Sequence, residues 1–157
     1  LVLQADAYHA IKPESAASFV AKLAASPGTA WLAEEDGTAC GYLFTLPWRV
    51  ELPPPVLDAR EIVLPEPPDC LYLHDLAVLG RMRGRGVGSL LVRHALARAV
   101  AWGYTRATLV AIQDSRDFWA RHGFFPPATV PQDIARALAS YGPAAVFLVA
   151  DIAELRG

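Results

Sequence analysis

A short apolar run in the middle of the chain organises the hydrophobic pattern. It extends from Leu71 to Leu79, is interrupted by His74 and Asp75, and ends at Gly80. A run of this length without alternation is typical of a strand buried on both faces of a sheet. We therefore predict a central buried strand here.

The apolar positions that follow recur at the spacing of a helix. From Ser89 onward they form three pairs, Leu91/Val92, Ala95/Leu96 and Ala99/Val100. The opposite side of such a helix carries polar or small residues, namely Arg93, His94, Ala97, Arg98 and Ala101. This pattern predicts an amphipathic helix with one buried stripe.

A basic, glycine-rich turn joins this strand to this helix. The first amides of a helix have no partner inside the helix, and the helix dipole places partial positive charge there. Gly84, Gly86 and Gly88 leave the backbone open to a ligand, and Arg83 and Arg85 add formal charge. The turn therefore predicts a phosphate-binding site.

The spacing of the turn excludes two common phosphate motifs. Glycines at alternate positions differ from the dinucleotide fingerprint, which also requires a later acidic residue for the ribose. No Gly-Lys-Ser/Thr follows, so the turn is not a Walker P-loop. A nucleic-acid patch is disfavoured by the net charge of −2.

The flanking segments predict the remaining helices and strands. Before the central strand we expect a helix that starts at Pro13, with an apolar stripe of Phe19, Val20, Leu23 and Ala24. We then expect a hairpin formed by 30–35 and 38–46, which turns at Asp36-Gly37. After the central helix we expect a buried strand over 107–113 and then a short helix over 116–122. Ser115 would cap this short helix, and Gly123, in a left-handed conformation, would end it. A further helix near 132–140 and a last strand over 145–152 would follow.

The segment 47–69 is different because it contains seven prolines. Such a segment cannot form one regular element, although short strand pieces at 50–52 and 62–64 are compatible with its composition. A long loop inside a compact domain is usually functional or mobile, and its prolines argue against simple mobility. We interpret it as a rim over a binding pocket, the alternative being a surface excursion without ligand contact.

Length and composition set further bounds. The 157 residues predict a single domain over 1–157, with no apolar run of membrane-spanning length and no signal peptide. Cys40 and Cys70 lie outside any metal-ligand spacing, so we predict no metal site, two free thiols and a cytoplasmic location.

Three motifs together resemble the signature of the GNAT superfamily, the acetyl-CoA-dependent N-acetyltransferases. Residues 83–88, Arg-Gly-Arg-Gly-Val-Gly, match the family motif Arg/Gln-x-x-Gly-x-Gly/Ala. The preceding strand, with His74-Asp75-Leu76-Ala77-Val78, resembles the family's fourth strand, and residues 117–124 resemble its "FYEKxGF" segment. The resemblance implies an α/β (α+β) fold, a mixed and mostly antiparallel sheet with splayed fourth and fifth strands and flanking helices. It also implies that Leu1–His9 belongs to the first helix and that the family's first strand lies upstream of residue 1.

The resemblance implies acetyl-CoA as the cofactor. Its pantetheine arm would pair with the strand backbone at Leu76, Ala77 and Val78. Its phosphates would bind the turn formed by Arg83, Gly84, Arg85, Gly86, Val87, Gly88 and Ser89. Ser115 and Trp119 would complete the cofactor site.

The catalytic residues implied by the resemblance are His74, Asp75 and Tyr141. His74 would act as the base or hold a water, since histidine titrates in the useful range. Successive strand residues point to opposite faces, so we expect one of His74 and Asp75 to face the pocket. Trp119 stands where many members have tyrosine, and indole is not a general acid, so Tyr141 is the candidate acid. The alternative is that His74 and Asp75 are structural and that Tyr141 is simply packed.

The predicted reaction is transfer of the acetyl group to a primary amine by direct attack in a ternary complex. The acceptor would be a small molecule or a peptide N-terminus, bound by Tyr42, Trp48, Arg49 and Glu51. No nucleic-acid or membrane partner is predicted, and a homodimer is compatible with the family. A catalytically silent acyl-CoA-binding domain and a site for a phosphate ligand other than CoA remain as alternatives.

Overall fold

The computed structural model describes residues 15–112 and 114–156, and these form one open five-stranded sheet flanked by helices. The strands lie in sequence order, β1 (Ala30–Glu35), β2 (Thr38–Trp48), β3 (Cys70–Val78), β4 (Arg106–Ala111) and β5 (Val146–Asp151). Neighbouring strands are antiparallel except β3 and β4, which are parallel. The predicted mixed, mostly antiparallel sheet is confirmed. The expectation for Leu1–His9 lies outside the described residues.

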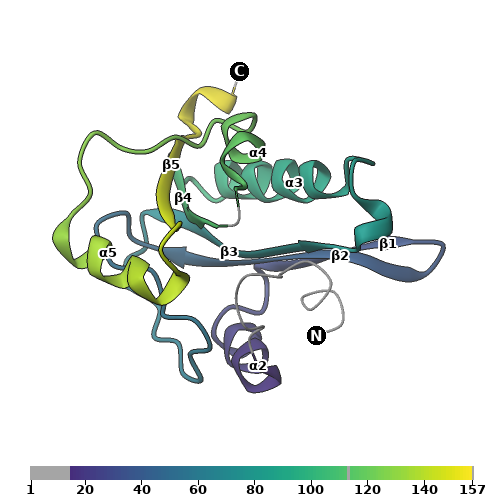
Figure 1. Cartoon of the computed structure of the whole chain (residues 1–157), viewed down its shortest axis with the longest axis horizontal. Coiled ribbons are helices and arrows are strands. Elements are labelled where there is room, and N and C mark those ends of the chain that lie inside the picture. Colours follow the sequence, from purple (N-terminus) through teal and green to yellow (C-terminus); the bar gives the residue numbers. More distant parts are fainter. Residues whose placement is uncertain (1–14, 113, 157) are drawn as a thin grey trace.

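The helices cover both faces of the sheet. Figure 1 shows α3 (Val87–Ala101) and α4 (Arg116–Ala120) on one face, with α2 (Ala16–Ala25) and α5 (Gln132–Ala137) on the other. The loop between β2 and β3 lies on the same side as α2 and α5. Short 3-10 turns complete the chain: η1 (Gly80–Met82), η2 (Leu138–Tyr141) and η3 (Ala153–Arg156).

The main core lies between α3 and the sheet. The predicted stripe of α3 is confirmed, because its buried residues are Leu91, Val92, Ala95, Leu96 and Ala99. They pack against sheet residues that are almost fully buried, among them Leu43, Leu71, Leu73 and Leu109. Each fully buried residue of this size contributes about 1.5–3 kcal/mol. This packing holds α3 against the sheet.

The predicted hairpin is also confirmed. Asp36 and Gly37 both have positive φ, 51° and 77°, as a tight two-residue turn between right-twisted strands requires. β2 continues past the predicted end at Leu46 and includes Pro47 and Trp48. The antiparallel pairing of Trp48 with Cys70 supports this extension.

The predicted apolar stripe of α2 is wrong. Val20 and Leu23 are exposed, whereas Ser18 and Lys22 are buried. The rotation of the helix follows from Phe19, whose ring contacts those of Tyr42 and Phe44 on β2. The Lys22 ammonium lies 5.1 Å from the centroid of the Phe19 ring, so its long stem packs on aromatic surface beneath the sheet.

Other predicted elements differ in detail. The segments 50–52 and 62–64 contain no strand. The helix expected over 132–140 ends at Ala137 and continues as η2. Ser115 occupies the N-terminal cap of α4, but its side chain makes no capping hydrogen bond. Gly123 has the expected positive φ, 87°.

In the part of the chain that the structure describes, the outer edge of β5 carries one isolated bridge. The amide of Phe125 donates to the carbonyl of Val149 at 3.0 Å, and the amide of Val149 donates back at 2.9 Å. The side chain of Asp151, at the end of the strand, accepts a hydrogen bond from the amide of Ala153. The chain thus leaves the sheet immediately after β5.

The close approach of β2 to the start of α3 predicts a specific sensitivity at Gly41. A Cβ atom there would lie 3.1 Å from Cγ1 of Val87 and 3.2 Å from the carbonyl oxygen of Ala77. We expect Gly41→Ala to lower the free energy of unfolding, measured in urea, by about 1–3 kcal/mol. Gly28→Ala is the matched control, since a Cβ there meets nothing within 4 Å. Equal unfolding free energies for the two variants would contradict this packing.

Candidate active site

The central feature of the site is the point where β3 and β4 part. In the described part of the chain they pair through three residue pairs, Leu71 with Ala107, Tyr72 with Thr108 and Leu73 with Leu109. Beyond Leu73 this ladder ends, while β3 continues to Val78 along β2. The divergence opens the sheet beside the first turn of α3.

The first turn of α3 presents backbone donors. Its first intrahelical hydrogen bond runs from the amide of Leu90 to the carbonyl of Gly86, so the amides of Val87, Gly88 and Ser89 have no partner within the helix. Gly86 caps the helix with φ 84°, and Gly84 has φ 77°, a conformation that disfavours side chains. No acidic residue lies in this turn. The free amide donors and the positive end of the α3 dipole together favour binding of an anion here.

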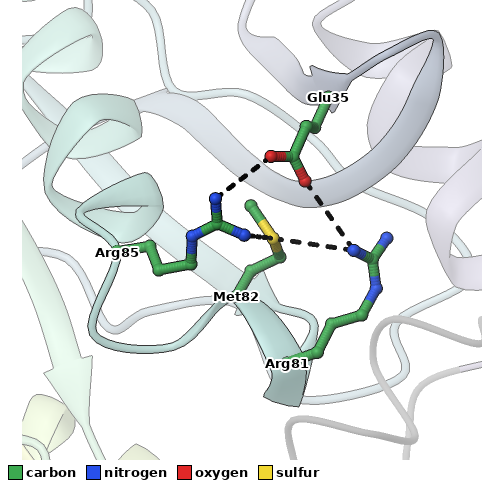
Figure 2. Close-up of polar contacts among 4 residues, drawn as sticks. All are labelled: Glu35, Arg81, Met82 and Arg85. Carbon is green, nitrogen blue, oxygen red and sulfur yellow. Dashed lines mark hydrogen bonds and ion pairs between the residues drawn. The ribbon is translucent and has the colours of Figure 1, made fainter.

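Two arginines beside this turn are held by one carboxylate (Figure 2). Glu35, at the end of β1, lies 3.3 Å from Nη2 of Arg85 and 3.7 Å from Nη1 of Arg81. Nη1 of Arg85 also lies 3.2 Å from Sδ of the buried Met82. Such exposed ion pairs contribute about 0.2–1 kcal/mol each, so their main effect is to orient the guanidinium groups. Arg83 is also exposed.

The opposite wall of this turn comes from α4 and the segment that follows it. The Ser89 hydroxyl lies 3.1 Å from Nε2 of His122. The ring of Phe118 lies against Gly88, where an added Cβ would approach it to 3.4 Å. Burial lowers the pKa of His122, and the charges of Arg93 and Arg121 lower it further. Sequence reasoning missed His122 and Phe118, although both lie within the motif 117–124.

A β-bulge at His74 changes the face on which the catalytic candidates lie. Phe44 pairs with Asp75 and Thr45 pairs with Leu73, so His74 is the extra residue on β3. The His74 ring lies 5.7 Å from that of Tyr72, centroid to centroid. Strict alternation would have placed His74 and Asp75 on opposite faces.

Asp75 lies on the face of the sheet that α2 covers. The Tyr42 hydroxyl donates to Oδ2 of Asp75 at 2.9 Å, and the Tyr42 ring contacts Phe19 of α2. Tyr42 and Asp75 are both buried. The bulge thus interrupts the strict alternation from which we expected only one of His74 and Asp75 to face the pocket.

Tyr141 ties the proline-rich loop to the sheet. Its hydroxyl donates to the carbonyl of Pro55, so the Tyr72 hydroxyl, 3.2 Å away, donates to the Tyr141 oxygen. All three side chains are buried. Trp48 adds a second tie, since its Nε1 donates to the carbonyl of Pro53 at 3.0 Å.

Arg49 and Glu51 engage each other within the loop. Nη2 of Arg49 lies 2.6 Å from Oε1 of Glu51, and Nη1 donates to the carbonyl of Pro67 at 3.0 Å. The hydrogen bond from Arg49 lowers the pKa of Glu51, and the pKa of Arg49 is raised by the same contact. These side chains fold the loop on itself, so a role toward substrate would require this contact to open.

The two remaining cofactor candidates lie around α4. Trp119 is buried in the main core, where its ring contacts those of Phe118 and Phe124. Ser115 is half-buried at the start of the same helix. Within the residues described, no three His, Cys, Asp or Glu side chains gather as metal ligands would. The described helices are all too short or too polar to span a bilayer.

Sequence comparison identifies the family. The profile of the acetyltransferase (GNAT) family matches residues 3–124. The match covers most of the chain, which therefore belongs to the GNAT acetyltransferase family. No curated protein has significant sequence similarity to the chain.

Several solved structures share the fold. The loading GNATL domain of CurA from Lyngbya majuscula has a TM-score of 0.77 at 12% identity, over 98% of this chain and 91% of that one. The GNAT-like decarboxylase GphF, in complex with isobutyryl-CoA, has a TM-score of 0.71 at 16% identity, over 96% and 92%. Arabidopsis thaliana Naa50, bound to the bisubstrate analogue CoA-Ac-MVNAL, has a TM-score of 0.61 at 16% identity, over 94% and 86%. CoA derivatives are thus ligands of this fold.

The contacts of Tyr141 generate a prediction about the loop. Tyr141→Phe leaves the Pro55 carbonyl without its donor, so we expect a loss of about 1–3 kcal/mol in the free energy of unfolding. Amide hydrogen exchange within 47–69 should also accelerate. Tyr104→Phe is the control, because the Tyr104 hydroxyl forms no hydrogen bond to the described residues. If both variants exchange at the wild-type rate, Tyr141 does not hold the loop.

Proposed function

We propose that the protein is an N-acetyltransferase that moves an acetyl group from acetyl-CoA to a primary amine by direct attack in a ternary complex. The observation that carries this proposal is the parting of β3 and β4 beside the open first turn of α3. An extended thioester arm can enter the opening while its phosphates bind the helix start. The family to which the chain belongs supports this assignment.

The cofactor would be held by backbone and by charge. The amides of Val87, Gly88 and Ser89 would bind its pyrophosphate, with Arg83 and Arg85 nearby. The backbone of Leu76, Ala77 and Val78 lies along the opening, where it would bind the pantetheine arm. When bound, the thioester supplies an activated acetyl group. The chain must then position the amine and remove its proton.

His74 is the proposed proton acceptor. An alkyl amine has a pKa of roughly 10.4 and is mostly protonated at neutral pH, so attack requires a base or a water held by one. His74 lies on the α2 face of the sheet, half-buried beside Tyr72, and Asp75 lies next to it. We assign Asp75 to orientation, because Tyr42 already binds its carboxylate.

Tyr141 is the proposed donor of the proton that the departing thiolate takes up. Its hydroxyl is bound to the Pro55 carbonyl, so donation requires the hydroxyl to turn from the loop. A simple thiol has a pKa of about 8.5, so thiolate leaves acceptably without an acid. The acid therefore matters less than the base.

The acceptor would enter from the face that carries α2 and the proline-rich loop. Aromatic side chains dominate this face, with Tyr42, Phe44, Trp48 and Tyr72 contributing rings. Such a lining suits a small amine with an apolar or aromatic group, or a peptide N-terminus such as the one mimicked in the Naa50 complex. Arg49 could bind a carboxylate after release from Glu51.

A thiol-release screen tests the proposal. Acetyl-CoA is offered with amino acids, polyamines, aminoglycosides, arylalkylamines and N-terminal peptides, and release of free thiol is measured. Release with an apolar or aromatic amine supports the proposal. CoA binding without release from any acceptor supports the silent acyl-CoA-binding alternative. A further arm with a carboxylated acyl-CoA examines the activity named for GphF.

Cofactor binding at the helix start predicts the effect of charge at Gly86. Gly86→Glu places a carboxylate where the phosphates would bind, and we expect calorimetry to show no CoA binding. Gly103→Glu is the matched control at the other end of α3, because Gly103 also has positive φ, 91°, and open space around its Cβ position. It should bind CoA with wild-type affinity. Unchanged affinity of Gly86→Glu would remove the phosphate site from this turn.

The role of His74 predicts a separation of turnover from binding. We expect His74→Gln to lower kcat by roughly 10²-fold while CoA affinity stays unchanged. His94→Gln, on the exposed side of α3, should behave as wild type. Near wild-type turnover of His74→Gln would assign His74 to structure.

A further inference from the structure

The hydrogen bond between Ser89 and His122 joins the candidate phosphate site to a titratable side chain. Ser89 lies in the first turn of α3, and His122 follows α4. Their side chains approach to 3.1 Å, and the ring of Phe118 lies 5.0 Å from the ring of His122. His122 is thus held in place between α3 and its own segment.

The chemistry of a hydroxyl decides what His122 does when an anion binds. A serine hydroxyl has one proton to donate. If Ser89 donates it to a phosphate oxygen, its own oxygen must accept from Nε2 of His122. The imidazole must then carry a proton on Nε2, and an imidazolium does so most strongly.

The free protein disfavours the imidazolium. The charged groups that act on His122 are Arg93, on α3, and Arg121, on its own segment. Both are cationic, and burial adds to their effect, so the pKa of His122 lies below its ordinary value. A bound phosphate would offset these cations and supply the negative charge that the free site lacks.

We propose that His122 is a positioning residue for the cofactor. Its imidazole takes up a proton when the pyrophosphate binds at Ser89, and this uptake makes CoA affinity depend on pH. This inference rests on the proposed cofactor site. It adds a residue that acts through Ser89 and leaves the acetyl-transfer step unchanged.

The direction of the pH dependence follows from linkage. The anion raises the pKa of His122 above its value in the free protein, so the complex binds more protons than the free protein between the two values. CoA affinity therefore increases as the pH falls through the pKa that His122 has in the complex, and it levels off below the pKa that His122 has in the free protein. Each unit by which the anion raises the pKa strengthens binding by about tenfold.

Calorimetric titration with dephospho-CoA gives the sharpest test. This probe keeps the pyrophosphate and lacks the phosphate monoester, whose own ionisation at about pH 6 would obscure the result. Binding enthalpies in two buffers of different ionisation enthalpy give the number of protons taken up. We expect wild type to take up a fraction of a proton at pH 7 and to gain about tenfold in affinity between pH 8 and pH 6.

Three variants identify the side chain that takes up the proton. His122→Gln keeps an amide donor without titrating, so proton uptake should vanish and affinity should become independent of pH. Ser89→Ala should diminish the uptake, because it removes the hydrogen bond between Ser89 and His122 and leaves only the charge of the phosphate to act on the imidazole. His94→Gln should retain the wild-type uptake. Uptake that persists in His122→Gln would overturn the proposal.

The outcomes also separate this inference from the proposed function. Tight binding of dephospho-CoA by wild type without proton uptake would overturn the role of His122 and leave the cofactor site intact. Absence of any binding to wild type would overturn both. The imidazole resonances of His122 provide an independent measure, since their midpoint should move to higher pH on binding.

Discussion

The point at which β3 stops pairing with β4 determines most of what the site can do. If β3 and β4 stayed paired as far as Val78, the backbone hydrogen-bonding groups of β3 would all have partners and no opening would separate the two strands. The ladder instead ends after Leu73, one residue before the bulge at His74. The burial of Leu71 and Leu73 against α3 holds the strand firmly up to this position. The opening therefore lies next to the packed main core, as suits a site that must hold two reactants in register.

The pattern of the sequence predicted the elements whose partners are local or strongly periodic. The stripe of α3, the run of β3 and the turn at Asp36-Gly37 each carry a signal within a few residues. The rotation of α2 carries none, because it depends on an aromatic contact between Phe19 and β2. The stem of Lys22 then covers apolar surface that the pattern had assigned to Val20 and Leu23.

The same distinction separates the candidate site residues. The glycine-rich turn was visible because its residue types are unusual and adjacent. Glu35 lies far from Arg85 in the sequence, and a glutamate at the end of a hairpin has many other uses. The bulge at His74 arises from the register between two strands, which alternation alone cannot reveal. Tyr72 and Tyr141 are likewise distant in sequence. The contact between their hydroxyls, and that of Tyr141 with the Pro55 carbonyl, form a tie between the sheet and the loop that composition could not reveal.

The bridge between Phe125 and Val149 has a consequence for the behaviour of the protein in concentrated solution. An unprotected edge strand offers a row of backbone groups on which another chain can add a strand. Here one residue occupies the middle of the outer edge of β5, and the turn at Asp151 directs the chain away from its end. A second chain would find no uninterrupted run of partners along this edge. At the other edge, β1 carries the exposed Glu34, whose charge would repel an identical strand in register. The sheet can thus remain open for its ligands without becoming a template for aggregation.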